Sequence, residues 1–238
     1  MRMRKKKHGE ERLLQCREYL YNHEGEPMAS PAEAVFGKEA KVYLEIGAGK
    51  GGFAVGMTKQ NPEVAYFAME RVTDCVVLAA EKAKTEERDN LRFIIDTADN
   101  LTKIFAKGSV DAIFLNFSDP WSKKGYAKRR LTHARYLAVY MHLLKDGGIL
   151  RFKTDNVGLF DFSLEQVSEV GLPLNKMTRD LHASEWNEGN VVTEYEAAFS
   201  AQGVKINMLE VVKPAGFSLE VPDDLKADRV SYRSNSEE

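Results

Sequence analysis

Short apolar runs alternate with helical patterns between residues 41 and 170, and this alternation constrains the fold more than any other feature. Five apolar runs predict strands, at residues 41–46, 64–70, 91–95, 110–117 and 149–154. The intervening or following segments predict helices, at residues 51–60, 73–84, 101–105, 130–144 and 159–170. Strands that are apolar throughout are typical of a parallel sheet covered on both faces.

The pattern changes after Gly171, where 172–181 and 204–212 predict two late strands that can pair antiparallel at one sheet edge. We therefore expect an α/β fold with a mostly parallel sheet, an antiparallel edge and helices on both faces. Residues 1–40 form a basic N-terminal arm and loop, with a helix over 10–21 and breaks near the prolines at 27 and 31. Residues 41–213 form the α/β domain, and 214–238 a loose C-terminal extension.

Composition limits the class of protein. The net charge is −2 in 238 residues, so any nucleic-acid partner must be held by a local basic patch. Cys16 and Cys75 are too few for a disulfide framework and lack metal-ligand spacing, so we interpret both as packed thiols and expect no metal. No stretch approaches the roughly 20 apolar residues that a membrane span needs. A cytoplasmic protein without a membrane partner is expected.

A glycine-rich turn follows the first predicted strand and predicts the first binding site. Gly47 and Gly49 permit a tight turn that lets backbone N–H groups approach a ligand. Glu70 ends the second strand, where a carboxylate can accept hydrogen bonds from both ribose hydroxyls of an adenosine. Glu45 favours S-adenosylmethionine over NAD, because a pyrophosphate would be repelled by a carboxylate two residues before Gly47.

The fourth predicted strand ends in a second candidate site. Pro120 disfavours a helical backbone at Asp119, so this carboxylate is expected on an extended turn that faces the crevice. Trp121 offers a flat surface on which a base can stack. No acidic residue occurs from Pro120 to Lys145, and seven lysines and arginines do. This asymmetry predicts a phosphate-binding surface beside the pocket, which we name the basic rim: Lys124, Lys128, Arg129 and Arg130.

Together these motifs make the chain resemble the tRNA (guanine-N7)-methyltransferase family. Three later segments also match that family: 152–156, 180–184 and 193–199. The resemblance runs from about residue 40 to 212, and it departs at Gly125-Tyr126, where the family usually has Arg-His. It implies a Rossmann-like class I methyltransferase domain over 41–213 that uses S-adenosylmethionine to methylate N7 of a variable-loop guanine in tRNA. We expect a monomer or a homodimer.

The resemblance also implies residue roles. Glu45, Glu70 and Asp119 would line the cofactor site with Gly47 and Gly49, and one of Asp96, Thr97 or Asp99 would contact the cofactor from the third strand. The positions that the family uses for the guanine and the tRNA are Lys123, Asp155, Thr193, Glu194, Tyr195 and Glu196. Asp119 is the candidate catalytic residue, and Asp119, Asp155 and Glu196 are the candidates to stabilise charge on the methylated base through its N1–H and amino edge.

The chemistry of the acceptor needs no general base, because guanine N7 carries a lone pair and no proton. The enzyme must align donor and acceptor and stabilise the positive charge that forms on the base. We interpret His182 as structural, since the histidines show no catalytic spacing. Two alternatives stay open from the sequence: an NAD-dependent oxidoreductase, which shares the glycine turn and Glu70, and a non-catalytic RNA-binding protein, which keeps only the basic rim.

Overall fold

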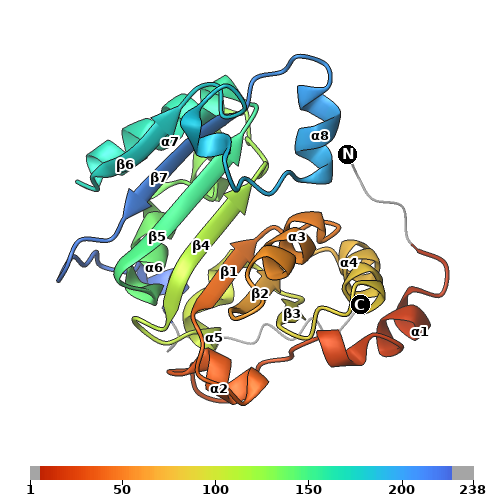
Figure 1. Ribbon diagram of the computed structural model, residues 1–238. Coiled ribbons are helices and arrows are strands. Elements are labelled where there is room, and N and C mark those ends of the chain that lie inside the picture. Colours follow the sequence, from red (N-terminus) through yellow and green to blue (C-terminus); the bar gives the residue numbers. More distant parts are fainter. Residues whose placement is uncertain (1–5, 227–238) are drawn as a thin grey trace, which may run out of the picture.

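The computed structural model describes residues 6–226, so the ends of the predicted arm and extension (1–5 and 227–238) lie outside the described residues. A seven-stranded sheet in the order β3-β2-β1-β4-β5-β7-β6 forms its centre (Figure 1). The strands are β1 (Val42–Ile46), β2 (Ala65–Met69), β3 (Leu91–Ile94), β4 (Val110–Asn116), β5 (Leu144–Thr154), β6 (Leu174–Thr178) and β7 (Asn207–Val212).

Strands β1 to β5 pair in parallel, whereas β7 runs antiparallel to both β5 and β6. The predicted fold, mostly parallel with an antiparallel edge, is confirmed. The chain moves outward from β1 to β3 and then crosses over to β4 on the other side of β1. The carboxyl ends of β1 and β4 therefore flank the point where the strand order reverses, which is where open α/β sheets bind ligands.

Helices cover both faces of the sheet (Figure 1). They are α1 (Gly9–Leu14), α2 (Pro31–Phe36), α3 (Gly52–Gln60), α4 (Thr73–Thr85), α5 (Leu101–Ile104), α6 (Ala134–Leu143), α7 (Val157–Glu169) and α8 (Glu194–Ser200). On one face, Leu44 of β1 shares a buried cluster with Leu137 of α6. On the other, Phe114 of β4 shares a second cluster with Phe53 of α3. Alternate residues of each strand thus pack into different cores, which explains the continuously apolar strand runs.

Several predicted boundaries differ from the structure. The helix expected over 10–21 is divided into α1 and a short 3₁₀ helix, Arg17–Tyr19. The helix expected from 130 begins at Ala134, because His133 caps it by accepting the Arg135 N–H at 3.2 Å. Strand β5 begins at Leu144, five residues early, with a register shift against β4 between Val110 and Ala112.

Two helices were missed. The proline at 31, expected to break helical structure, is the first residue of α2, where its fixed φ and missing N–H are tolerated. Helix α8 begins behind a capping box in which the Thr193 hydroxyl accepts the Glu196 N–H at 2.9 Å. The expected loose extension packs as far as it is described, since Val221 and Leu225 are buried in the core. Within residues 6–226, no helix has the length and apolar character to cross a membrane.

Candidate active site

The glycine turn after β1 folds back over the end of β2. Gly47 and Gly49 have φ of 82° and 55°, in the left-handed region that glycine adopts without strain. The N–H groups of Gly47 and Ala48 both donate to the Met69 carbonyl oxygen, at 2.8 and 3.0 Å. The turn therefore lies directly beside the residue that follows Met69, Glu70.

Glu70 is held by backbone donors from both sides. Its Oε2 accepts the Gly49 N–H at 2.9 Å and its Oε1 accepts the Val72 N–H at 2.8 Å. The side chain is nearly buried, yet it forms part of a cavity wall. A carboxylate offers about four lone-pair positions, so two stay available to hydroxyl groups in the cavity. This arrangement suits the predicted contact with a ribose.

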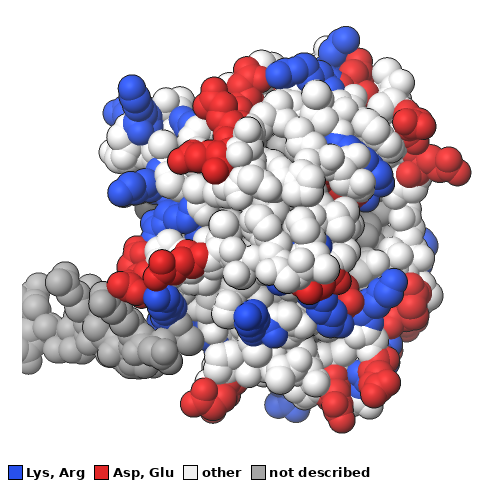
Figure 2. All heavy atoms as spheres, turned by 90° about the vertical axis from the view of Figure 1, so that its left-hand side faces the viewer, with Lys and Arg blue, Asp and Glu red and all other residues white. Residues whose placement is uncertain are grey.

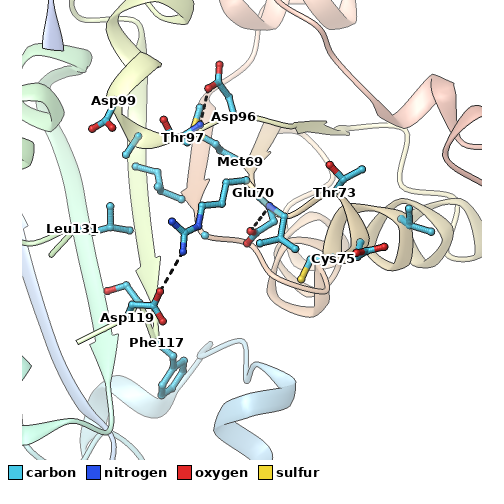
Figure 3. A pocket seen from close by; sticks show the side chains of 18 of the residues that line it. Met69, Glu70, Thr73, Cys75, Asp96, Thr97, Asp99, Phe117, Asp119 and Leu131 are labelled. Carbon is cyan, nitrogen blue, oxygen red and sulfur yellow. Dashed lines mark hydrogen bonds and ion pairs between the residues drawn. The ribbon is translucent and has the colours of Figure 1, made fainter. Parts of the chain in front are cut away.

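A cavity of about 1430 Å³ lies at the carboxyl ends of β1, β2, β3 and β4 (Figure 3). Among its lining residues are five that the sequence predicts for the cofactor: Gly47, Glu70, Asp96, Thr97 and Asp119. These residues are spread over 73 positions of the chain, from 47 to 119, and the parallel sheet brings them together. Lys6 and His8 of the N-terminal arm also line the cavity.

Acidic residues after β3 form the upper part of the cavity in Figure 3. Asp96 Oδ1 accepts the Thr97 N–H and the Asn100 amide, both at 2.7 Å. Asp99 Oδ1 accepts the Tyr136 hydroxyl at 2.6 Å, and burial together with this bond raises the pKa of Tyr136. Each aspartate keeps its second carboxylate oxygen for a ligand, so Asp96 and Asp99 both remain candidates for the contact from the third strand.

Asp119 lies at the mouth of the cavity, where 69% of its side chain is exposed. Its Oδ2 forms an ion pair with Arg71 at 3.6 Å, marked by the dashed line at Asp119 in Figure 3. The neighbouring Phe117 and Trp121 have φ of 51° and 41°, which is uncommon for side chains of this size. Such backbone strain is concentrated at ligand sites, and here it lies on both sides of Asp119 in the sequence.

Ser118 provides an independent sign of a ligand. Its hydroxyl is buried in the cavity wall, and it is one of two buried side-chain polar atoms without a hydrogen-bond partner within residues 6–226. A buried hydroxyl left without a partner costs about 1–3 kcal/mol. A ligand with a polar group near Ser118 would remove that cost.

The basic rim is only partly free to bind a polyanion. Lys124 and Lys128 are exposed on a 3₁₀ helix, Lys124–Arg129. The guanidinium of Arg129 lies 5.1 Å from the centre of the Trp121 ring and 4.7 Å from that of Tyr126. This stacking keeps Arg129 at the cavity, which it lines. Tyr126, one of the residues in place of the family's Arg-His, thus supports the Arg129 and Trp121 side chains.

Arg130 has a different environment from the rest of the basic rim. Its guanidinium donates to the Pro120 and Trp121 carbonyl oxygens at 3.0 and 3.2 Å and lies 4.3 Å from the centre of the Phe162 ring. These contacts hold the Asp119 turn in place. Two further cations of the acid-free stretch, Arg135 and Lys145, form ion pairs with acidic residues elsewhere in the chain.

The side of the molecule with the edge strand β6 has a mixed charge. Lys and Arg side chains there are interspersed with Asp and Glu around an uncharged centre (Figure 2). Neither positive nor negative side chains form a continuous patch in this view, so this face shows no basic surface that could bind a phosphate backbone. The basic rim remains the better candidate for an RNA contact.

Two residues predicted for the cofactor do not line the cavity. Gly49 acts through its N–H on Glu70. Glu45 is 1% exposed, and its carboxylate accepts the Asn116 amide at 3.0 Å and the Tyr66 hydroxyl at 3.4 Å. Burial raises the pKa of Glu45 to about 7, although the hydrogen bond from Asn116 and the nearby Lys153 favour the charged form. The structure thus places Glu45 in the core beneath the glycine turn, and a direct cofactor contact by Glu45 stays a prediction.

The residues predicted for the substrate divide into an exposed and a buried group. Tyr195 is 43% exposed, donates its hydroxyl to Asp155 Oδ2 at 3.1 Å, and its ring centre lies 4.9 Å from that of Phe117. Neither Tyr195 nor Asp155 lines the cavity, but Tyr195 contacts Phe117, which does. Lys123 is exposed before the 3₁₀ helix of the basic rim.

Thr193, Glu194 and Glu196 make internal contacts instead. Thr193 caps α8, Glu194 forms an ion pair with Lys82 of α4, and Glu196 is fully buried against Lys153. None of the three lines the cavity. Their predicted contacts with substrate therefore stay predictions that this arrangement does not support directly.

Sequence reasoning did not assign four of the cavity residues to the cofactor site: Arg71, Phe117, Ser118 and Tyr136. Arg71 directly follows a predicted strand and Phe117 is the last residue of another, so their positions at strand ends could have indicated that they line the cavity. Tyr136 lies in the acid-free basic stretch, and its contact with Asp99, 37 positions earlier, was not predictable from spacing. Both cysteines are free and buried, as expected. Within residues 6–226, no group of three or more His, Cys, Asp or Glu side chains could hold a metal ion.

A comparison with protein families decides between the alternatives. A family model described as "Putative methyltransferase" matches residues 39–209, which is well over half of the chain. The chain belongs to this family. It is the family of the tRNA guanine-N7 methyltransferases, so the resemblance inferred from the motifs is confirmed. The family depends on S-adenosylmethionine, and the chain is accordingly an S-adenosylmethionine-dependent methyltransferase rather than an NAD-dependent oxidoreductase.

Solved structures share the fold at low identity. The 16S rRNA methyltransferase KamB is 14% identical, with a TM-score of 0.58 over 81% of this chain and 97% of that chain. An antibiotic-related methyltransferase is 15% identical, with a TM-score of 0.57 over 80% and 96%. A geranyl diphosphate C-methyltransferase from Streptomyces coelicolor A3(2), solved with Mg²⁺, geranyl diphosphate and S-adenosylhomocysteine, is 16% identical, with a TM-score of 0.51 over 77% and 79%. At these identities the likeness establishes the class I methyltransferase fold.

The residues of the cavity fit this cofactor. Glu70 keeps two acceptor positions for ribose hydroxyls, and Asp96 and Asp99 each keep one oxygen for the amino group of a base. The Ser118 hydroxyl lacks the partner that a bound ligand can provide. Several carboxylates also suit a ligand that carries a sulfonium and an ammonium group. The cavity is therefore the candidate site that would hold S-adenosylmethionine.

Proposed function

We propose that the chain methylates N7 of a guanine in the variable loop of tRNA. One observation carries this proposal: Asp119 lines the cofactor cavity, and the basic rim begins only five residues later in the sequence, at Lys124. A methyl acceptor would meet the cofactor at this mouth, and the exposed Lys124 and Lys128 of the basic rim offer cations for the acceptor's phosphates. Family membership supports tRNA as the acceptor.

The cofactor, when bound, supplies an electrophilic methyl group. Guanine N7 attacks with its own lone pair, so no residue must remove a proton beforehand. Positioning is then the main task of the protein, and alignment of two reactants can contribute about 7–11 kcal/mol. In this proposal Asp119 accepts hydrogen bonds from the N1–H and amino group of the guanine, and its negative charge stabilises the positive charge that develops on the base.

Arg71 gives Asp119 a partner when no guanine is present. The ion pair is long, at 3.6 Å, and both side chains are more than half exposed. Exposed pairs of this kind contribute little, with a median of about 0–1 kcal/mol. A guanine edge can therefore displace Arg71 from Asp119 without a large loss.

The far wall of the acceptor site comes from Phe117 and Tyr195. Their ring centres are 4.9 Å apart with an interplanar angle of 41°, and Tyr195 also stacks on Phe199 at 4.2 Å. These rings, together with Trp121, which lines the cavity, offer surfaces for an unstacked base. Asp155 accepts a hydrogen bond from the Tyr195 hydroxyl, and its other carboxylate oxygen is the second hydrogen-bond acceptor that we propose for the guanine edge.

Methylation of bulk unmodified tRNA with labelled S-adenosylmethionine tests the proposal. We expect the label in 7-methylguanosine after digestion to nucleosides. Label in a different nucleoside would replace the guanine-N7 assignment with another acceptor atom. An unlabelled tRNA pool together with measurable binding of S-adenosylhomocysteine would remove tRNA as the substrate while leaving the methyltransferase intact.

A further inference from the structure

Three successive residues at the start of α8 contact three different parts of the enzyme. Glu194 forms an ion pair with Lys82 of α4 and lies against Gly52, where any side chain would collide with its carboxylate. Tyr195 faces Phe117 and Asp155 at the acceptor side. Glu196 points into the protein and is fully buried. Helix α8 therefore connects the start of α3, just after the glycine turn, with the proposed acceptor site.

Glu196 meets a buried lysine from the sheet. Lys153 of β5 is 1% exposed, and its Nζ donates to Glu196 Oε2 at 2.6 Å. The same Nζ donates to Asn190 Oδ1 and to the Val191 carbonyl oxygen, both at 3.0 Å. Lys153 thus holds the segment that leads into α8 as well as the helix itself.

The second oxygen of Glu196 is also fully used. Its Oε1 receives His182 Nε2 at 2.8 Å and the Asn190 amide at 2.9 Å. Although burial by itself raises the pKa of Glu196, the pair with Lys153 and the bonds from His182 and Asn190 outweigh it and hold that pKa below its ordinary value. A buried carboxylate with donors on both oxygens has little capacity left for a guanine.

The end of β5 contacts α8 at two points. Lys153 lies within β5, and Asp155 is the first residue after the strand. Lys153 holds Glu196 inside, and Asp155 accepts the Tyr195 hydroxyl outside. Breaking a buried ion pair at one partner is strongly destabilising, because it leaves the other charge uncompensated.

We propose that Lys153 is a positioning residue for methyl transfer, which acts through Glu196 to place α8, and that Glu196 does not itself contact the substrate. This inference rests on the proposed function, because only that function makes Tyr195 of α8 part of the acceptor site. The residues that form the cofactor wall, Gly47, Glu70 and Asp96, belong to other elements. Loss of the buried pair should therefore impair the acceptor side more than the cofactor side.

A double-mutant cycle on the full chain tests this assignment. Lys153→Met and Glu196→Gln should each lower kcat/KM for tRNA by about ten- to a hundredfold, since a 1 Å misplacement can cost about 10²-fold. The double variant removes both buried charges and keeps the glutamine side chain for His182 and Asn190, so it should recover activity beyond either single variant. Affinity for S-adenosylhomocysteine should change by less than about threefold in each variant. This change is small beside the roughly 10²-fold loss of rate that a misplaced acceptor can cause.

Losses that multiply in the double variant would overturn the proposal and make Glu196 a direct substrate contact. Lys176→Met is the matched control, because it breaks an ion pair with Glu210 at 3.3 Å near the far sheet edge. That control should keep the wild-type kcat/KM.

Hydrogen–deuterium exchange separates this proposal from the proposed function. In Lys153→Met, residues 193–200 should exchange faster than in the wild type, while β1 and β4 stay as protected as before. This result does not depend on the identity of the substrate. Unchanged exchange across 193–200 would overturn the positioning role even if tRNA is methylated, and faster exchange with no tRNA methylation would leave the positioning role while removing the proposed acceptor.

Discussion

The buried carboxylate of Glu45 should make the stability of this enzyme depend on pH in an unusual direction. Its pKa is about 7 in the folded chain against an ordinary value of 4.5, chiefly because it is buried. The folded chain therefore binds more protons than the unfolded chain between these two values. Stability must then fall as the pH rises through that window, and the full penalty is present above pH 7.

The size of the effect follows from the two pKa values. Because one pKa unit corresponds to about 1.4 kcal/mol, ionised Glu45 should destabilise the fold by about 3 kcal/mol at pH 8. Glu45→Gln removes this penalty. The glutamine carbonyl can still accept the Asn116 amide, and its NH₂ group can donate to the Tyr66 hydroxyl, so both present contacts have replacements.

Urea unfolding at pH 5 and pH 8 measures the prediction. The stability of Glu45→Gln relative to wild type should increase by about 2–3 kcal/mol from the lower to the higher pH. Glu63→Gln, at an exposed position on the surface, is the control and should show no such increase. An equal difference between Glu45→Gln and wild type at both pH values would refute the reasoning.

Three further predictions concern the site. Glu70→Ala should weaken S-adenosylhomocysteine binding by about 1–3 kcal/mol in calorimetry, because ribose hydroxyls lose a buried acceptor, and unchanged affinity would exclude that role. Replacing Lys128 and Arg129 by alanine should reduce the salt dependence of tRNA binding by roughly 0.7–0.9 per lost phosphate contact, whereas an unaltered slope would mean that they face away from RNA. Asp119→Asn should slow methylation without a new pH dependence near neutrality, and a new ionisation there would indicate a general base.

The sheet could be predicted from the sequence because its parallel strands are short runs that are apolar throughout. The sequence predicted much of the cofactor cavity for a related reason: Gly47, Glu70 and Asp119 each follow a strand, and parallel strands bring their carboxyl ends to one edge. The resemblance added the family, and the family model confirmed it.

The sequence could not show which charged side chains are free to bind a ligand and which form contacts within the protein. Arg130 reads like its neighbours in the basic rim, yet its guanidinium holds the Asp119 turn through two carbonyl oxygens. The resemblance implies that Glu196 contacts the substrate, yet its carboxylate is buried against Lys153, 43 positions earlier in the chain. Contacts of this kind depend on tertiary packing, which periodicity and motif spacing do not encode.

The central claim, methylation at guanine N7, is tested most directly by removing that nitrogen. A tRNA transcribed with 7-deazaguanosine keeps its phosphates and its Watson–Crick edge, so it should bind with the affinity of the ordinary transcript. It has no lone pair at position 7, and we predict that it accepts no methyl group from labelled S-adenosylmethionine while the ordinary transcript does. Methyl transfer to the 7-deaza tRNA at the ordinary rate would contradict the assignment, because the enzyme would then be attacking another atom.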